Sequence, residues 1–162
     1  MLAPRIELLR SKKLIGKKIK MSLATNKTVE LWRSFMLQKA KINNVVSEEL
    51  YSIQVYDDDL GFKDFKPTTE FVKWAAIEVS SYYEIPKGME TLTLEEGNYA
   101  VFVHKGLAKD FAQTYNYIFN TWLSNANYLL DNRPHFEVLG SKYKNNDPSS
   151  EEEVWIPIRP KI

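Results

Sequence analysis

The first half of the chain alternates apolar and polar residues in three stretches, which predicts three β-strands. The predicted strands are residues 12–23, 49–56 and 70–79. Between the first two, apolar residues recur near helical spacing, which predicts a helix over residues 28–42. The apolar stripe of this helix consists of Val29, Trp32, Phe35 and Met36. The acidic stretch at residues 57–67 separates the last two strands and is typical of a loop.

The second half follows the same pattern with a longer helix. Its predicted strands are residues 89–106, 135–143 and 152–158. The first of these is interrupted at Glu96, Gly97 and Asn98, which predicts a bulge or a turn. A helix is predicted over residues 109–125, and we expect its apolar stripe to pack in the core. The stripe consists of Phe111, Tyr115, Ile118, Phe119 and Trp122.

Both halves therefore have the order β-α-β-β, which predicts a single α+β domain over residues 1–162. Repeat one spans about residues 5–80 and repeat two about residues 89–160. Duplicated units of this kind usually form a continuous antiparallel sheet with both helices on one face. The opposite face of the sheet is then either covered by other parts of the chain or used for binding. We expect a ligand groove on this face, between the repeats.

Composition narrows the chemistry that this domain can perform. Aromatic residues make up 13% of the chain, and large rings commonly line small-molecule pockets. The absence of cysteine excludes disulfides, thiolate metal sites and a cysteine nucleophile. With two histidines in the chain, we expect no metal site and no cofactor. His104 and His135 are both predicted to lie at the surface.

The charges are distributed unevenly along the chain. Residues 1–46 carry a net charge of +9 and the remainder −8. The basic run at residues 12–20 is compatible with phosphate contacts, although a strand with a solvated lysine face is the favoured interpretation. No stretch is long and apolar enough for a signal peptide or a membrane span, so we expect a cytoplasmic protein without membrane contact.

The last predicted strand of each half places a tryptophan and a glutamate on one face. Trp74 and Glu78 share a face of the first, and Glu153 and Trp155 share a face of the second. We expect the two pairs to meet across the central groove. Indole rings beside a carboxylate suit a lipophilic cation, because each ring contributes about 0.5–2 kcal/mol of cation–π attraction. The alternative is a solvated sheet edge with tryptophans that pack against their neighbours.

The second half also resembles a known family. The matching runs are GNYAVFVHKG (97–106), TYNYIFNTWL (114–123), FEVL (136–139) and SEEEVWIPI (150–158). They are similar to the GyrI-like small-molecule-binding domain, which is also the effector-binding domain of certain AraC-type and MerR-type bacterial transcription regulators. The similarity is close over residues 70–162. Over residues 1–69 it is mainly a similarity in the order of elements.

The resemblance implies a groove that binds amphipathic, often cationic, compounds around an acidic residue of the last strand. That residue is Glu153, with Trp155 beside it and Glu137 as a second carboxylate. Trp74 and Glu78 occupy the positions where the first repeat supplies its wall. Regulators of the family carry a helix-turn-helix domain before this module, whereas few residues precede the first strand here. We therefore expect a stand-alone module without direct DNA binding.

Three functions are compatible with these residues. The first is a small-molecule-binding protein in which Glu153 is the counter-charge of a cationic ligand. Such a protein either sequesters a toxic compound or delivers a signal to a protein partner. The second, also implied by the resemblance, is a hydrolase of strained cyclopropane-type toxins in which Glu153 is the catalytic residue that positions or deprotonates water. The third is a protein-binding inhibitor of a topoisomerase. The sequence does not separate binding from catalysis, because both use the same side chains.

Overall fold

The computed structural model describes residues 3–58 and 60–161. Residues 1, 2 and 162 of the predicted domain and residue 59 of the predicted loop lie outside the described residues. The helical segments are α1 (Thr28–Gln38), η1 (Lys39–Lys41), η2 (Phe62–Asp64), η3 (Ala108–Asp110), α2 (Phe111–Asn116), η4 (Tyr117–Trp122) and α3 (Leu123–Asn125). The strands are β1 (Arg5–Leu9), β2 (Lys12–Met21), β3 (Val45–Val55), β4 (Phe71–Val79), β5 (Glu90–Leu94), β6 (Gly97–Lys105), β7 (Tyr128–Leu130), β8 (His135–Leu139) and β9 (Glu151–Pro160).

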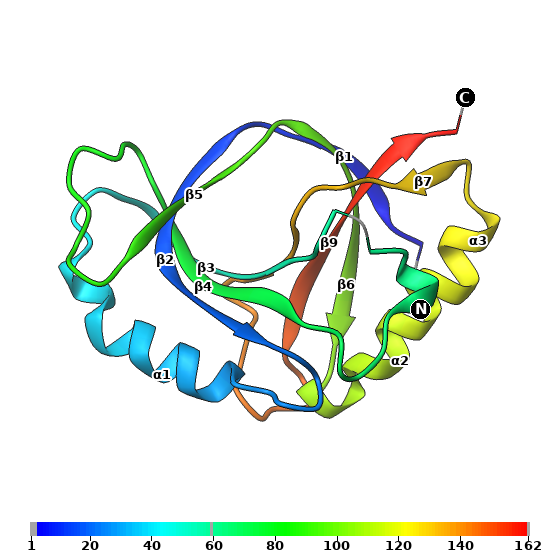
Figure 1. Cartoon of the computed structure of the whole chain (residues 1–162), viewed down its shortest axis with the longest axis horizontal. Helices are drawn as coiled ribbons and strands as arrows, with labels where there is room; N and C mark the ends of the chain where they lie inside the picture. Colours follow the sequence, from blue (N-terminus) through cyan, green and yellow to red (C-terminus); the bar gives the residue numbers. More distant parts are fainter. Residues whose placement is uncertain (1–2, 59, 162) are drawn as a thin grey trace.

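The strands form a curled antiparallel sheet with the order β1-β6-β9-β8-β3-β4-β2-β5, and β7 pairs with β9 beside this path. At the centre, β3 of the first half pairs with β8 of the second. The short outer strands are exchanged between the halves, because β1 pairs with β6 and β5 pairs with β2. Figure 1 shows the resulting half-barrel, with the helices on its outside. The α+β class and the antiparallel sheet are as expected from the sequence.

The interruption predicted near Gly97 falls where β5 ends and β6 begins. The two strands belong to opposite ends of the sheet, so the break redirects the chain across the molecule. A β-carbon at Gly97 would lie 2.1 Å from Nη1 of Arg133, so a larger residue there requires the guanidinium to move. Strand β7 was not predicted, because three residues are too few to show a pattern, and β1 was not predicted although it is as long as β8.

The first helix packs on the sheet with a different face from the one predicted. Leu31 and Phe35 are buried, whereas Val29 and Met36 of the predicted stripe are 68% and 47% exposed. The prediction was therefore wrong for these two residues. The reason is that the helix contacts the sheet along a narrow line, where it faces β2 and β4.

The second helix runs from α2 through η4 to α3, and its middle turn, η4, is a π-helix. Ile118 is fully buried there, and the other members of the predicted stripe are partly buried around it. This helix packs against β6 and β9 on the same side of the sheet as α1 (Figure 1). We call the helix-covered side of the sheet the outer face and the opposite side the inner face.

Candidate functional site

The inner face carries a cluster of buried side chains. Its members are Leu9, Leu14, Tyr51, Ile53, Trp74, Ala76, Leu94, Tyr99, Val101, Phe136, Val138 and Trp155. The cluster is rich in aromatic rings because strands β3, β4, β6, β8 and β9 each contribute one ring to it, from Tyr51, Trp74, Tyr99, Phe136 and Trp155. Both predicted tryptophans, Trp74 and Trp155, belong to it.

The pairing register places the two tryptophans in one row across the sheet. Trp74 pairs with Ile53, Ile53 pairs with Phe136, and Phe136 pairs with Trp155. Neighbouring strands lie about 4.8 Å apart, so the backbones at Trp74 and Trp155 are separated by roughly 14 Å along the sheet. The indole of Trp155 stacks on Phe136, with ring centroids 5.3 Å apart. The tryptophans thus flank the centre of the inner face, and Ile53 and Phe136 lie between them.

A basic side chain stands at each end of this row. Lys18 pairs with Trp74, and its Nζ lies 5.5 Å from the centre of the Trp74 ring. At the other end Arg5 pairs with Val101, which pairs with Trp155, and the guanidinium carbon of Arg5 lies 6.0 Å from the Trp155 ring. Each indole of the inner face therefore has a cation of the chain itself above it.

Glu153 is held between Trp155 and Arg5. Its Oε1 accepts a hydrogen bond from Nε1 of Trp155 at 3.1 Å, and its Oε2 accepts one from Nη2 of Arg5 at 2.6 Å. Arg5 also donates from Nε to Glu7, at 2.7 Å. The side chain of Glu153 is 36% exposed, so its carboxylate stays accessible from solvent. Arg5 is a residue of this site that the sequence did not reveal, because its strand was not predicted.

Glu78 lies on the inner face with Trp74, four residues further along β4. Its carboxylate forms an ion pair with Nζ of Lys12 at 3.3 Å, and 18% of its side chain is exposed. The glutamates of the two predicted tryptophan–glutamate pairs, Glu78 and Glu153, therefore both have a basic partner within the chain.

Tyr51 connects the two halves of the site and was not predicted either. It pairs with Ala76 on one side and with Val138 on the other, at the centre of the inner face. Burial raises the pKa of its hydroxyl, and the negative charges of Glu78, Glu49 and Glu153 raise this pKa further. These carboxylates, from β4, β3 and β9, therefore surround one phenol. Glu49 and Tyr51 are two residues apart in β3, so they share a face of the sheet. This spacing could have identified both residues from the sequence.

A pocket opens beside Glu153, at the end of the inner face where β8 turns into β9. Its volume is about 240 Å³. The residues that line it are Glu49, Val103, Val138, Gly140, Ser141, Lys142, Glu151, Glu152 and Glu153. The pocket is thus acidic, with four glutamates and one lysine among its lining residues.

Glu137 does not share this face. It pairs with Val154, whereas its neighbour Val138 pairs with Glu153, so Glu137 points to the outer face. There it is 6% exposed and accepts hydrogen bonds from Nε2 of Gln54 and from the hydroxyl of Tyr115, both at 2.9 Å. The placement of Glu137 as a second carboxylate of the groove is therefore corrected. The sheet separates it from Glu153.

Glu137 belongs to a buried polar cluster under the helices. Nζ of Lys73 lies 3.8 Å from its carboxylate, and burial lowers the pKa of this lysine although the glutamate acts in the opposite direction. Glu152 lies nearby, and burial together with the charge of Glu137 raises its pKa to about 7. The cluster thus joins β4, β8, β9 and α2 on the outer face, directly behind the row of rings.

Both histidines are buried, so their predicted exposure was wrong. His104 is 2% exposed, with Nδ1 2.7 Å from the hydroxyl of Thr114 and Nε2 3.1 Å from the carbonyl of Leu107. His135 is 4% exposed among the rings of Tyr56 and Phe62, and burial lowers its pKa to about 3. Within the described residues, no group of three or more His, Cys, Asp or Glu side chains is arranged to hold a metal ion.

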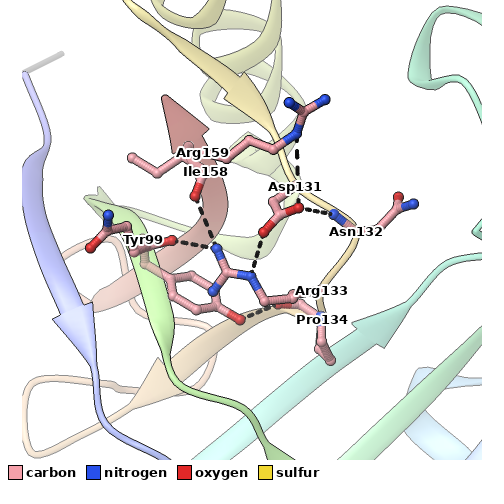
Figure 2. A network of polar contacts seen from close by, with 8 residues as sticks. Tyr99, Asp131, Asn132, Arg133, Pro134, Ile158 and Arg159 are labelled. Carbon is pink, nitrogen blue, oxygen red and sulfur yellow. Dashed lines mark hydrogen bonds and ion pairs between the residues drawn. The ribbon is translucent and has the colours of Figure 1, made fainter. Parts of the chain in front are cut away.

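A separate polar network fixes the rim of the inner face (Figure 2). Arg133 donates from Nε to Asp131 at 2.7 Å, and from Nη2 to the carbonyls of Asn98 at 2.8 Å and Ile158 at 3.0 Å. Its guanidinium also lies 4.8 Å from the ring centre of Tyr99. The network ties β6, β9 and the segment before β8 together, and so holds β9, the strand that carries Trp155 and Glu153.

The fold and the aromatic, acidic inner face define a half-barrel domain of the small-molecule-binding type. The chain belongs to the GyrI-like family: the model of the GyrI-like small molecule binding domain matches residues 2–159. This confirms the resemblance seen in the sequence. Of the described residues, no helix is long and apolar enough to cross a membrane.

Two curated relatives and one solved structure illustrate the similarity. The transcriptional regulator BrlR of Pseudomonas aeruginosa is 26% identical over 130 residues, which cover 80% of this chain and 45% of BrlR. This chain thus matches less than half the length of that relative. The DNA gyrase inhibitor of Escherichia coli K12 is 30% identical over 124 residues, or 73% of each chain. The structure of SAV2435 bound to tetraphenylphosphonium has a TM-score of 0.70 at 17% identity and covers 98% of this chain and 94% of its own.

Proposed function

We propose that this protein binds small amphipathic cations on the inner face of its half-barrel. Glu153 is the counter-charge in this proposal, Trp155 and Trp74 are the aromatic walls, and Glu78 is a secondary polar contact. Glu137 has no direct part, because it lies on the outer face. The matching strand order in the two halves supports the expected duplicated β-α-β-β unit, with the binding face across its centre.

The observation that carries the proposal is the arrangement around Arg5. A guanidinium lies over an indole and forms an ion pair with the carboxylate next to it. The site thus already holds a cation by the two interactions that a cationic ligand would use. The fold neighbour SAV2435, whose bound ligand is tetraphenylphosphonium, supports cations of this shape as the first to test.

The space available favours a ligand that rearranges the site. The pocket beside Glu153 has a volume of about 240 Å³, and pockets for drug-sized ligands usually measure about 300–1,000 Å³. A bulky cation therefore has to displace side chains of the inner face. Arg5 and Lys18, at the two ends of the row, have partly exposed side chains, so their displacement requires the least free energy.

Calorimetric titration with tetraphenylphosphonium tests the proposal. We expect Glu153→Gln to weaken binding about five- to thirtyfold, because a solvent-accessible carboxylate near a cation contributes about 1–2 kcal/mol. Glutamine still offers an oxygen to Nε1 of Trp155, so the site keeps its shape. Glu96→Gln is the matched control, since Glu96 pairs with Arg10 at 3.0 Å on an exposed turn. Equal affinity of Glu153→Gln and wild type would show that Glu153 is not the counter-charge.

A second function is favoured by the relationship to the E. coli DNA gyrase inhibitor, which matches 73% of each chain. In this case the chain would act on a topoisomerase through its surface and not through the inner face. A gyrase supercoiling assay with added protein tests it. Unchanged supercoiling at micromolar protein would retire this candidate.

A further inference from the structure

Arg5 occupies the position that the proposed ligand requires. Its guanidinium lies 6.0 Å from the ring of Trp155, and its Nη2 lies 2.6 Å from the carboxylate of Glu153. The ring and the carboxylate cannot contact a second cation in the same way while Arg5 is in place. A ligand that uses both therefore competes with a side chain of the same chain.

Arg5 is attached to a part of the sheet that can release it. Strand β1 is five residues long and stands at one end of the strand order, where it pairs with β6. The side chain of Arg5 is 45% exposed, and Glu7 on the same strand holds its Nε at 2.7 Å. When Nη2 leaves Glu153, the guanidinium thus moves into solvent with a carboxylate still bound to it. No buried charge is left without a partner.

We propose that Arg5 is a built-in competitor that limits which cations the inner face accepts. This inference rests on the proposed function and concerns the same site. Exchange of Arg5 for a ligand leaves the number of charges at Glu153 unchanged, so the lost Arg5 ion pair offsets part of what the ligand gains from Glu153. The rest of the affinity has to come from apolar contact with Trp155 and Phe136. Large aromatic cations are then selected over small hydrated ones such as tetramethylammonium.

Removal of the competitor has a calculable effect. If Arg5 covers Glu153 for about 70–90% of the time, the apparent affinity of a cation is lowered about three- to tenfold. We therefore expect Arg5→Gln to bind tetraphenylphosphonium about three- to tenfold more tightly than the wild type. Tetramethylammonium gains the same factor, because Arg5 competes equally with any cation at Glu153.

Salt dependence separates competition from a structural role. In the wild type one cation replaces another at Glu153, so added salt changes the affinity little. In Arg5→Gln the ligand meets a free carboxylate, so its affinity falls more steeply with ionic strength. A variant that had merely altered the shape of the site would keep the wild-type salt slope.

The experiment is calorimetric titration of the wild type, Arg5→Gln and Arg10→Gln with tetraphenylphosphonium and with neutral triphenylphosphine oxide, at two salt concentrations. Arg10→Gln is the matched control, because it removes an exposed Arg–Glu pair of 3.0 Å that lies outside the site. Tighter cation binding by Arg5→Gln alone, with a steeper salt slope and little change for the neutral compound, supports the inference.

Two results would overturn it, and they are distinguishable. If the wild type binds the cation and Arg5→Gln binds it equally or more weakly, Arg5 is not a competitor, although the proposed function stands. If neither protein binds the cation at millimolar concentration, the proposed function fails and the inference fails with it. Thermal unfolding of both variants shows whether they are folded.

Discussion

Replacement of Glu137 by glutamine tests the assignment of this residue to the outer face. The substitution keeps the size of the side chain and an oxygen for the hydroxyl of Tyr115. It removes the negative charge that lies 3.8 Å from Nζ of Lys73, where both side chains are at most 10% exposed. We expect the free energy of unfolding to fall by about 3 kcal/mol at pH 7, because a buried charge that loses its partner costs about 3–5 kcal/mol. The lower value applies here because Lys73, whose pKa burial already lowers, can lose its proton.

The assay is urea denaturation followed by tryptophan fluorescence. For a domain of this size the loss corresponds to about 6–12 °C in melting temperature. The deficit of Glu137→Gln should shrink as the pH is raised from 7 to 10. Below the unfolded pKa of lysine, the unfolded variant binds a proton that the folded variant lacks, so stability rises with pH. Lys73→Met added to Glu137→Gln should restore most of the loss.

The outcome that would refute this reasoning is a loss below 1 kcal/mol together with weaker binding of tetraphenylphosphonium. Glu137 would then act on the ligand and not on the fold, contrary to its position on the outer face. Tyr115→Phe is a useful companion, because it removes one hydrogen bond to the carboxylate and leaves the charge pair in place.

Two further predictions concern partly buried charged groups. Because the pKa of Glu152 is raised to about 7, chiefly by burial, its contribution to stability is greatest below the unfolded pKa near 4.5 and is lost as pH rises to about 7. Glu152→Gln should remove this slope from the pH dependence of unfolding and should be more stable than wild type at pH 8. Arg133→Met should lower the free energy of unfolding by about 2–3 kcal/mol in urea denaturation, because the carbonyls of Asn98 and Ile158 lose their donor. A change under 0.5 kcal/mol would mean that water replaces the guanidinium there.

Alternation along a strand was enough to predict which side chains share a face. It grouped Trp74 with Glu78 and Glu153 with Trp155, because successive residues of a strand point to opposite sides. By the same rule Glu137 lies on the face opposite its neighbours Phe136 and Val138. Alternation could not tell which of those faces joins the face of Glu153, because this depends on the register between β8 and β9.

Other features depend on contacts between distant parts of the chain. Arg5 reaches Glu153 from β1, a strand that was not predicted and that is distant from Glu153 in the sequence. His135 is buried because Phe62, from the loop before β4, stacks on its ring with centroids 5.2 Å apart. The sequence around His135, which follows Pro134, does not indicate such a contact. The burial of His104 likewise depends on Thr114 of the second helix.

The indole N–H signals of the four tryptophans offer the most direct test of the central claim. Trp74 and Trp155 lie in the inner-face cluster, whereas Trp32 and Trp122 pack with the helices on the outer face. A ¹H–¹⁵N correlation spectrum recorded during titration with tetraphenylphosphonium should show shifts of the Trp74 and Trp155 signals, assigned with Trp74→Phe and Trp155→Phe. The signals of Trp32 and Trp122 should stay in place. Shifts confined to Trp32 and Trp122, or no saturable shift of any indole, would contradict binding on the inner face.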